Sequence, residues 1–206
     1  MFRLKLTIYF LLLCTFTVRA QGVGLVMSGG GATGFAHIGV IQALEENNIP
    51  IDYITGTSAG ALIGAMYASG YSPEEIKTYV LSDEFQLMAK GDIESDFEFL
   101  LRKDRPNASD ISFSFRLDSL LKNSLPTNLV RPELLDFEMM RIFGATSAFS
   151  NNEFDSLFVP FRCVASDIVK KQPHVFSKGK LNEAVRASMT FPFYINPIRI
   201  DGVLYF

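Results

Sequence analysis

Gly56-Thr57-Ser58-Ala59-Gly60 is the stretch that decides the fold. It stands between a strand predicted at 51–55 and a series of small residues with a helical pattern that continues through Ala68. A G-x-S-x-G turn between a strand and a helix is typical of a nucleophile elbow. The serine then occupies a sharp, strained bend, and its hydroxyl projects above the sheet at the positive end of the helix. Ser58 is therefore the candidate nucleophile, and a purely structural turn serine is the alternative.

A second glycine-rich turn, Gly29-Gly30-Gly31-Ala32-Thr33-Gly34, follows the apolar run 24–27 and opens a helix predicted over 34–48. It matches the dinucleotide fingerprint G-x-G-x-x-G, which also needs an acidic residue at the end of the next strand. Asp52 stands at the start of that strand instead. Free N–H groups at a helix start suit a developing negative charge. We therefore expect an oxyanion hole formed by Gly29, Gly30, Gly31 and Ala59, with a phosphate site and a plain tight turn as alternatives.

Two successive strand–turn–helix units predict a parallel sheet with crossover helices, and hence an α/β fold. Ser72, Pro73 and Glu75 form a capping box that begins another helix. The remaining pattern predicts strands at 112–117 and 158–165, helices at 133–143 and 182–189, and a hairpin of 198–200 with 203–206 around Asp201 and Gly202.

Residues 1–20 have the pattern of a secretory signal peptide. Arg3 and Lys5 precede an apolar run, and Ala20 provides a small residue for cleavage before Gln21. A buried N-terminal helix is the alternative. Cys163 is the cysteine that remains after cleavage, so we expect an exported protein without an internal disulfide, and a thiol that is simply a small buried group.

Composition limits the class of protein. The chain has 206 residues, of which 48% are hydrophobic and 20% charged, enough for the core of one ordinary domain. The net charge of −3 makes nucleic acid a poor partner. The sequence stops inside the apolar run 203–206, and we expect the chain to be a fragment.

A serine nucleophile needs a base, and the two histidines are poor candidates. His37 falls inside the first predicted helix, where packing or hydrogen bonding is the expected role, and His174 falls in a polar loop at 171–174. The chemistry therefore favours a serine–aspartate dyad.

These residues resemble the patatin-like phospholipase family. The resemblance rests on the two glycine motifs and on the segments 34–40, 165–167 and 184–188 with Phe191-Pro192, and it runs from about Gly24 to the end. It implies a three-layer fold with a mostly parallel central sheet flanked by helices over 24–206, incomplete at the C-terminus. The motif glycines carried over are Gly29, Gly31, Gly34, Gly56 and Gly60.

The resemblance implies a lipid acyl hydrolase of the phospholipase A or esterase type, needing no metal and no cofactor. The family base lies in an Asp-Gly-Gly or Asp-Gly-Ala motif, whereas this chain offers Asp201-Gly202-Val203. Asp201 is a weak candidate, because the matching stretch of bacterial relatives forms a turn just before the motif. The base would then follow Phe206. Thr33 is a second departure, since bacterial members usually carry Arg or Lys there.

The implied partners are a lipid substrate and a membrane surface. Exported relatives often continue into an outer-membrane β-barrel, which would place this domain in the periplasm, at the outer membrane or at the cell surface. Core packing or an acyl-chain groove are the two interpretations of Phe97, Phe99, Phe113 and Phe115. The rival functions are a non-catalytic lipid- or protein-binding domain on the same scaffold and a nucleotide-binding domain.

Overall fold

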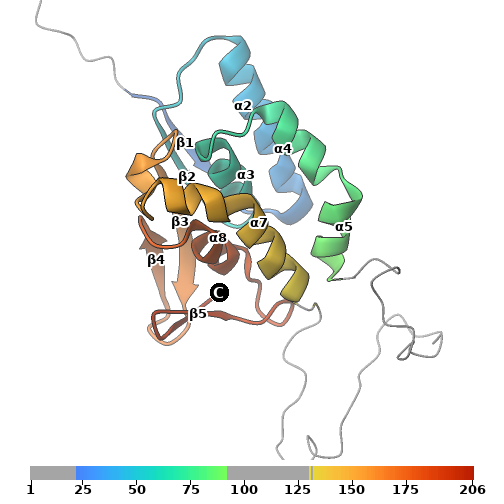
Figure 1. Ribbon diagram of the computed structural model, residues 1–206, viewed down its shortest axis with the longest axis vertical. Helices are drawn as coiled ribbons and strands as arrows, with labels where there is room; N and C mark the ends of the chain where they lie inside the picture. Colours follow the sequence, from blue (N-terminus) through green and yellow to red (C-terminus); the bar gives the residue numbers. More distant parts are fainter. Residues whose placement is uncertain (1–21, 92–129, 131) are drawn as a thin grey trace, which may run out of the picture.

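The computed structural model describes residues 22–91, 130 and 132–206, which form a mixed sheet flanked by helices (Figure 1). The sheet has the order β1-β2-β3-β6-β5, and β4 pairs with β3 off this path. The pairings β1–β2 and β2–β3 are parallel, whereas β3–β4, β3–β6 and β5–β6 are antiparallel. The strands are β1 (Gly24–Met27), β2 (Tyr53–Gly56), β3 (Phe161–Asp167), β4 (Gln172–Phe176), β5 (Ile198–Ile200) and β6 (Val203–Tyr205).

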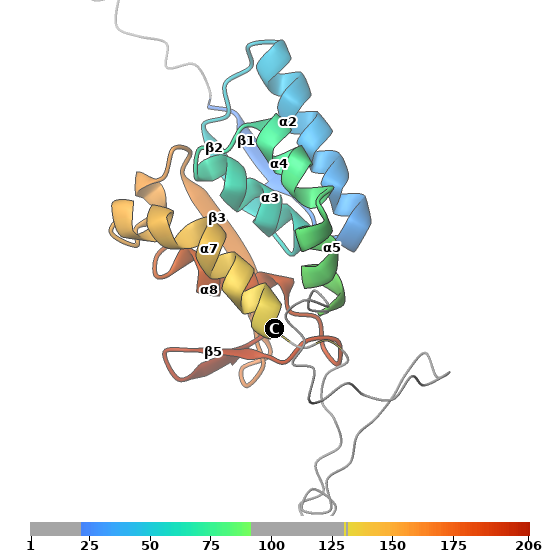
Figure 2. The ribbon, with the colours of Figure 1, turned by 45° about the vertical axis from the view of Figure 1, so that its right-hand side comes forward.

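The helices gather in two groups. Helices α2, α4 and α5 lie side by side at one end of the molecule, and α7 and α8 pack together at the other, as both views show (Figures 1 and 2). The short 3₁₀ helices are η1 (Gly31–Phe35) and η4 (Phe154–Ser156). The α-helices are α2 (Ala36–Glu46), α3 (Ala59–Ala68), α4 (Pro73–Val80), α5 (Asp83–Lys90), α7 (Glu133–Phe149) and α8 (Leu181–Met189).

Helix α3 is the central helix of the fold, and every one of its residues is buried. Its Gly64 lets the helix approach the sheet closely, because a Cβ there would lie 2.8 Å from Ile54 Cγ2 and 3.2 Å from Phe161 Cε2. Met27, Ile54 and Phe161 thus share one apolar face of the three parallel strands. The opposite face carries Val26, which is 78% exposed. Burial of the apolar side chains on this one face holds β1 and β2 in register against α3, although each strand has only four residues.

Most of the predicted elements are confirmed, with shifted ends. The capping box at Ser72 and Glu75 is formed in both directions. Strand β3 covers 161–167 rather than 158–165, and α7 continues to Phe149 rather than ending near 143. The predicted strand at 112–117 and the four phenylalanines at 97, 99, 113 and 115 lie outside the described residues, as does the segment 1–20.

The polar loop predicted around His174 is wrong, because these residues form strand β4. His174 lies opposite Ala165 in the antiparallel β3–β4 ladder. Its ring centroid is 4.5 Å from that of Phe176 and 5.2 Å from that of Tyr205. Pairing with β3 supplies the backbone hydrogen bonds that the polar sequence could not predict.

Cys163 is fully buried in β3, where burial raises the pKa of its thiol far above the ordinary range. The prediction of a small buried cysteine is therefore confirmed. Within residues 22–91 and 132–206, no helix is both long and apolar enough to cross a membrane.

Candidate active site

Ser58 lies on a strained bend between β2 and α3. Its backbone has φ 54° and ψ −121°, a conformation that a non-glycine residue rarely adopts. Such strain costs about 1–3 kcal/mol and persists only where the surroundings hold it. The N–H of Thr57 donates to Met27 O over 3.0 Å, and the N–H of Leu62 donates to Ser58 O over 3.0 Å. Ser58 is half-buried, and its hydroxyl has no hydrogen-bond partner among the described residues.

The glycines on either side of Ser58 allow β2 and α3 to meet at this bend. A Cβ on Gly56 would lie 2.4 Å from Gly60 O and 2.7 Å from the backbone nitrogen of Ala61. No side chain fits at that separation from backbone atoms. The N-terminal end of α3 therefore comes directly above the end of β2, with its partial positive charge at Ser58.

The glycine-rich loop lies against the serine bend. A Cβ on Gly29 would be 3.0 Å from Ser58 Cβ and 3.8 Å from Ser58 Oγ. A Cβ on Gly34 would be 2.6 Å from Ala59 Cβ, so η1 also touches the first residue of α3. Two motifs predicted separately from the sequence are thus in contact.

Backbone N–H groups of this loop are available as donors. Within the described residues, no hydrogen bond is found from the N–H groups of Gly30, Gly31 or Ala59. Gly30 O is held by Thr33, which donates to it from its backbone N–H over 3.2 Å and from Oγ1 over 2.8 Å. Because C=O and N–H point in opposite directions in a trans peptide, this fixes the Gly31 N–H on the side away from Thr33. Such preorganised N–H groups can stabilise an oxyanion.

His37 supports the same loop. Its Nε2 lies 3.0 Å from the carbonyl oxygen of Ser28, the residue just before the three glycines. Since a carbonyl only accepts, Nε2 carries the proton. The predicted hydrogen-bonding role of His37 is confirmed.

Ser188 is a site residue for which sequence reasoning assigned no role. The N–H of Ser58 donates to Ser188 Oγ over 2.9 Å, and Ser188 Oγ donates to Val164 O over 2.6 Å. Ser188 stands near the C-terminal end of α8, 130 positions from Ser58. The segment 184–188 was part of the family resemblance, but no local pattern predicts this contact.

Asp201 lies in the turn between β5 and β6, with φ 48° and with Gly202 at φ 83°. Tyr205 pairs with Asp167, and Ser58 lies at the level of Val164. About seven strand positions thus separate Asp201 from Ser58, on the order of 23 Å along the strand direction. The hairpin part of the prediction is confirmed, and the turn does not bring the Asp201 carboxylate to Ser58.

The carboxylates of Asp167 and Asp52 accept hydrogen bonds from the backbone. Asp167 Oδ1 accepts hydrogen bonds from the N–H groups of Val169 and Lys170, which closes the turn after β3. Asp52 Oδ2 accepts from the N–H of Val23 over 2.7 Å, at the start of β2. Among the described residues, no carboxylate is hydrogen-bonded to Ser58 and no group of three metal-binding side chains is found.

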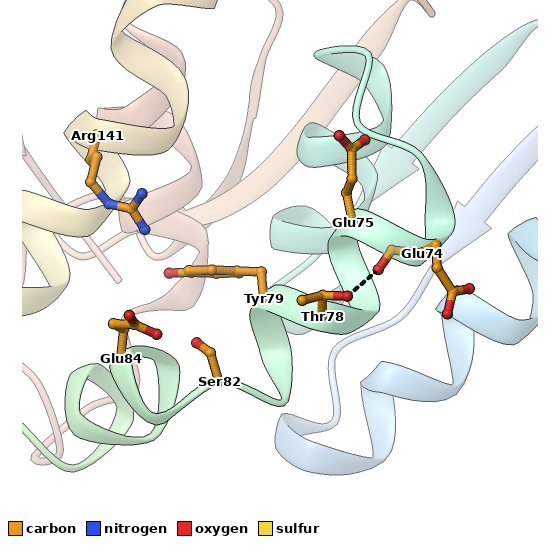
Figure 3. A pocket seen from close by; sticks show the side chains of 7 residues that line it. All are labelled: Glu74, Glu75, Thr78, Tyr79, Ser82, Glu84 and Arg141. Carbon is orange, nitrogen blue, oxygen red and sulfur yellow. Dashed lines mark hydrogen bonds between the residues drawn. The ribbon is translucent and has the colours of Figure 1, made fainter.

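A cavity of about 420 Å³ lies elsewhere, among α4, α5 and α7 (Figure 3). Several of the polar groups that line it have hydrogen-bond or ion-pair partners. Arg141 pairs with Glu138 over 2.7 Å, Thr78 donates to Glu74 O, and Glu75 belongs to the capping box. Burial and the nearby Glu138 raise the pKa of Tyr79 well above its ordinary range. Neither Ser58 nor the glycine loop lines this cavity, so we do not assign the chemistry to it.

Comparisons with known proteins agree with this geometry. The sequence model of the family described as "Patatin-like phospholipase" matches residues 25–206. "Lysophospholipase NTE1" of Coccidioides immitis is 34% identical over 182 residues, and "Lysophospholipase nte1" of Aspergillus fumigatus is 32% identical over the same length. Each alignment covers 88% of this chain but only 10% of the relative.

A solved structure shows a similar fold. VipD from Legionella pneumophila superposes with a TM-score of 0.54 at 14% identity, covering 90% of this chain and 45% of VipD. At this level of identity the likeness concerns the arrangement of the elements.

Proposed function

Because the chain belongs to the patatin-like phospholipase family, we propose that it is a lipid acyl hydrolase with Ser58 as its nucleophile. One observation carries the proposal. The strained bend at Ser58 presents a hydroxyl that has no hydrogen-bond partner in the described part of the chain, and it does so beside the glycine loop, with Gly29 in near contact. Strained backbone conformations of this kind cluster at active sites, and a serine on such a bend is typical of a nucleophile elbow.

The proposed reaction has two halves. A carboxylate base takes the Ser58 proton as Oγ attacks the ester carbonyl, and the negative charge forms on the carbonyl oxygen. The N–H groups of Gly30, Gly31 and Ala59 are the proposed donors to that oxygen, each worth roughly 3 kcal/mol in typical oxyanion holes. The alcohol leaves with a proton, and water then releases the fatty acid from the acyl-serine.

The base is proposed to be an aspartate after Phe206, which completes a serine–aspartate dyad. The direction of β6 supports this. Phe206 and Ser166 exchange backbone hydrogen bonds of 2.9 and 2.6 Å, so the chain runs antiparallel to β3 at that point. Continued pairing in this direction leads along Ala165 toward Val164, where Ser188 and Ser58 meet.

A membrane surface is the proposed source of substrate, and the loop after α8 is the proposed contact. Phe191, Phe193 and Tyr194 are 69%, 82% and 40% exposed, and residues 190–195 carry no charge. Exposed aromatic side chains are typical of lipid interfaces. The loop begins directly beyond Ser188 and Met189, so the bilayer would lie near the reacting serine.

The same loop is held in place by hydrogen bonds. The buried Arg186 donates to Asn196 O over 3.2 Å, and the Tyr194 hydroxyl donates to Ala89 O over 3.2 Å. Phe193 has φ 65°, a strained value for a bulky residue. The strained backbone at Phe193 holds its ring in solvent, as expected of a side chain that is buried only when the protein binds a membrane.

Export through residues 1–20 and a position in the periplasm, at the outer membrane or at the cell surface are proposals as well, as is a continuation into an outer-membrane β-barrel. Cell fractionation and sequencing of the mature N-terminus test the first of these, with Gln21 expected as the first residue.

The decisive experiment uses a fluorophosphonate probe and a lysophospholipid ester on the protein expressed from its complete reading frame. We expect labelling and hydrolysis by the wild type, loss of both in Ser58→Ala, and wild-type behaviour in Ser166→Ala, which removes an exposed serine of β3. Equal labelling of wild type and Ser58→Ala would refute the assignment. An unlabelled wild type that binds lipid vesicles would favour the non-catalytic binding domain, and a thermal shift with dinucleotides would favour the nucleotide-binding alternative.

A further inference from the structure

We propose that Ser188 is the positioning residue that holds the nucleophile bend in its strained conformation, an inference that rests on the proposed role of Ser58. Its hydroxyl connects the bend to α8 and β3 through the two hydrogen bonds of 2.9 and 2.6 Å. Ser188 is 7% exposed, so water does not easily replace these bonds.

The direction of each hydrogen bond follows from chemistry. A serine hydroxyl has one hydrogen, and a backbone carbonyl can only accept. The Ser188 proton therefore goes to Val164 O, and a lone pair of Ser188 Oγ accepts the Ser58 N–H. Ser188 is thus oriented by β3 before it acts on the bend.

The position of Val164 explains why a side chain is needed here. The last β2–β3 pair is Gly56 with Cys163, so Val164 is the first residue beyond the point where β2 leaves the sheet. The chain turns away through Thr57 and Ser58. The next described strand on this edge of β3 is β6, which reaches only to Phe206 opposite Ser166, so no described backbone carbonyl accepts the Ser58 N–H. Ser188 supplies the missing acceptor from α8.

Because of this contact, the two successive N–H groups of the bend, those of Ser58 and Ala59, have different roles. The Ser58 N–H is used by Ser188, whereas the N–H of Ala59 has no partner in the described part of the chain. Ser188 therefore acts on the geometry of Ser58 and does not touch the proposed substrate. Its loss should lower kcat and leave KM unchanged, because the ground-state contacts of the lipid remain.

Ser147 offers a matched control. It is also 7% exposed, and its Oγ accepts a backbone N–H, that of Leu181, over 3.0 Å at the start of α8. Ser147→Ala and Ser188→Ala therefore remove the same kind of buried hydrogen bond from opposite ends of one helix. Only the second removal concerns Ser58.

The test compares Ser188→Ala, Ser147→Ala and Ser188→Cys, which has a weaker acceptor of similar size. Hydrogen exchange of the peptide containing Ser58 measures the bend directly, and fluorophosphonate labelling rate, kcat and KM measure its consequence. We expect faster exchange and at least tenfold lower labelling rate and kcat in Ser188→Ala, with KM unchanged. Ser188→Cys should be intermediate and Ser147→Ala normal.

Ser58 peptide exchange and labelling that are the same in Ser188→Ala and Ser147→Ala would overturn the proposal. If Ser188→Ala does not fold, the graded effect of Ser188→Cys decides in its place, and wild-type exchange in that variant counts against the proposal. A wild type without fluorophosphonate labelling would refute the proposed function. The hydrogen-exchange rate of the Ser58 peptide would still show whether Ser188 holds the bend.

Discussion

Gly60 lies so close to Met27 that a Cβ on it would be 2.5 Å from the Met27 carbonyl oxygen. This contact joins the first turn of α3 to the end of β1, and it brings Ser58 over the sheet beside the glycine loop. The same carbonyl oxygen accepts a hydrogen bond from the Thr57 N–H. Neither partner can move without displacing the bend.

We therefore expect Gly60→Ala to lower the free energy of unfolding by about 3 kcal/mol, at the upper end of typical overpacking penalties. Gly39→Ala is the matched control, since Gly39 lies in α2 with nothing within 4 Å of an added Cβ. That substitution should stabilise the protein by about 1 kcal/mol through helix propensity. Urea denaturation measures both, and equal effects of the two substitutions would contradict the packing argument.

The membrane contact predicts a loss of vesicle binding when the aromatic rings are removed. Phe191→Ala combined with Phe193→Ala should weaken cosedimentation with phospholipid vesicles by at least about tenfold, because each fully buried phenylalanine contributes on the order of 2 kcal/mol and about 1.4 kcal/mol corresponds to a factor of ten. Phe149→Ala removes a phenylalanine that is 89% exposed at the end of α7 and should leave binding unchanged. Equal vesicle affinity of the loop variant and the wild type would remove the loop from the proposal.

The position of Asp201 in the β5–β6 turn predicts that a variant without its carboxylate remains active. Asp201→Asn keeps a side chain that tolerates the left-handed φ of 48° and removes the carboxylate. We expect fluorophosphonate labelling within about twofold of the wild type, since the carboxylate lies far from Ser58 by strand register. A folded Asp201→Asn protein that no longer reacts would instead identify Asp201 as the base.

The sequence predicted the parts of the fold and of the site that local chemistry determines. The bend at Ser58, the free amides of the glycine loop and the capping box at Ser72 each follow from a few adjacent residues. Strand β4 could not be predicted in this way, because Gln172 and Pro173 are polar or strand-breaking and only pairing with β3 orders them. The hydrogen bond between Ser58 and Ser188 spans 130 positions and becomes visible only when α8 is packed against the sheet.

Thr33 is where the chain departs from the Arg or Lys that bacterial members of the family usually carry, and the structure gives its hydroxyl a defined partner. Oγ1 donates to Gly30 O, which orients the peptide whose N–H belongs to Gly31. Thr33→Val removes this bond but keeps the shape of the side chain, while the backbone N–H of Thr33 still reaches Gly30 O over 3.2 Å. Only part of the orientation is lost.

We therefore expect Thr33→Val to lower kcat by about five- to tenfold, or roughly 1 kcal/mol, less than the loss of a whole oxyanion donor. Thr33→Ser should retain the wild-type rate. Thr78→Val removes the same type of bond, from Thr78 Oγ1 to Glu74 O over 2.8 Å, on the exposed side of α4, and should not affect kcat. If Thr33→Val and Thr78→Val have the same rate, the hydroxyl of Thr33 does not orient the oxyanion loop, and the Gly31 N–H is held by the backbone alone.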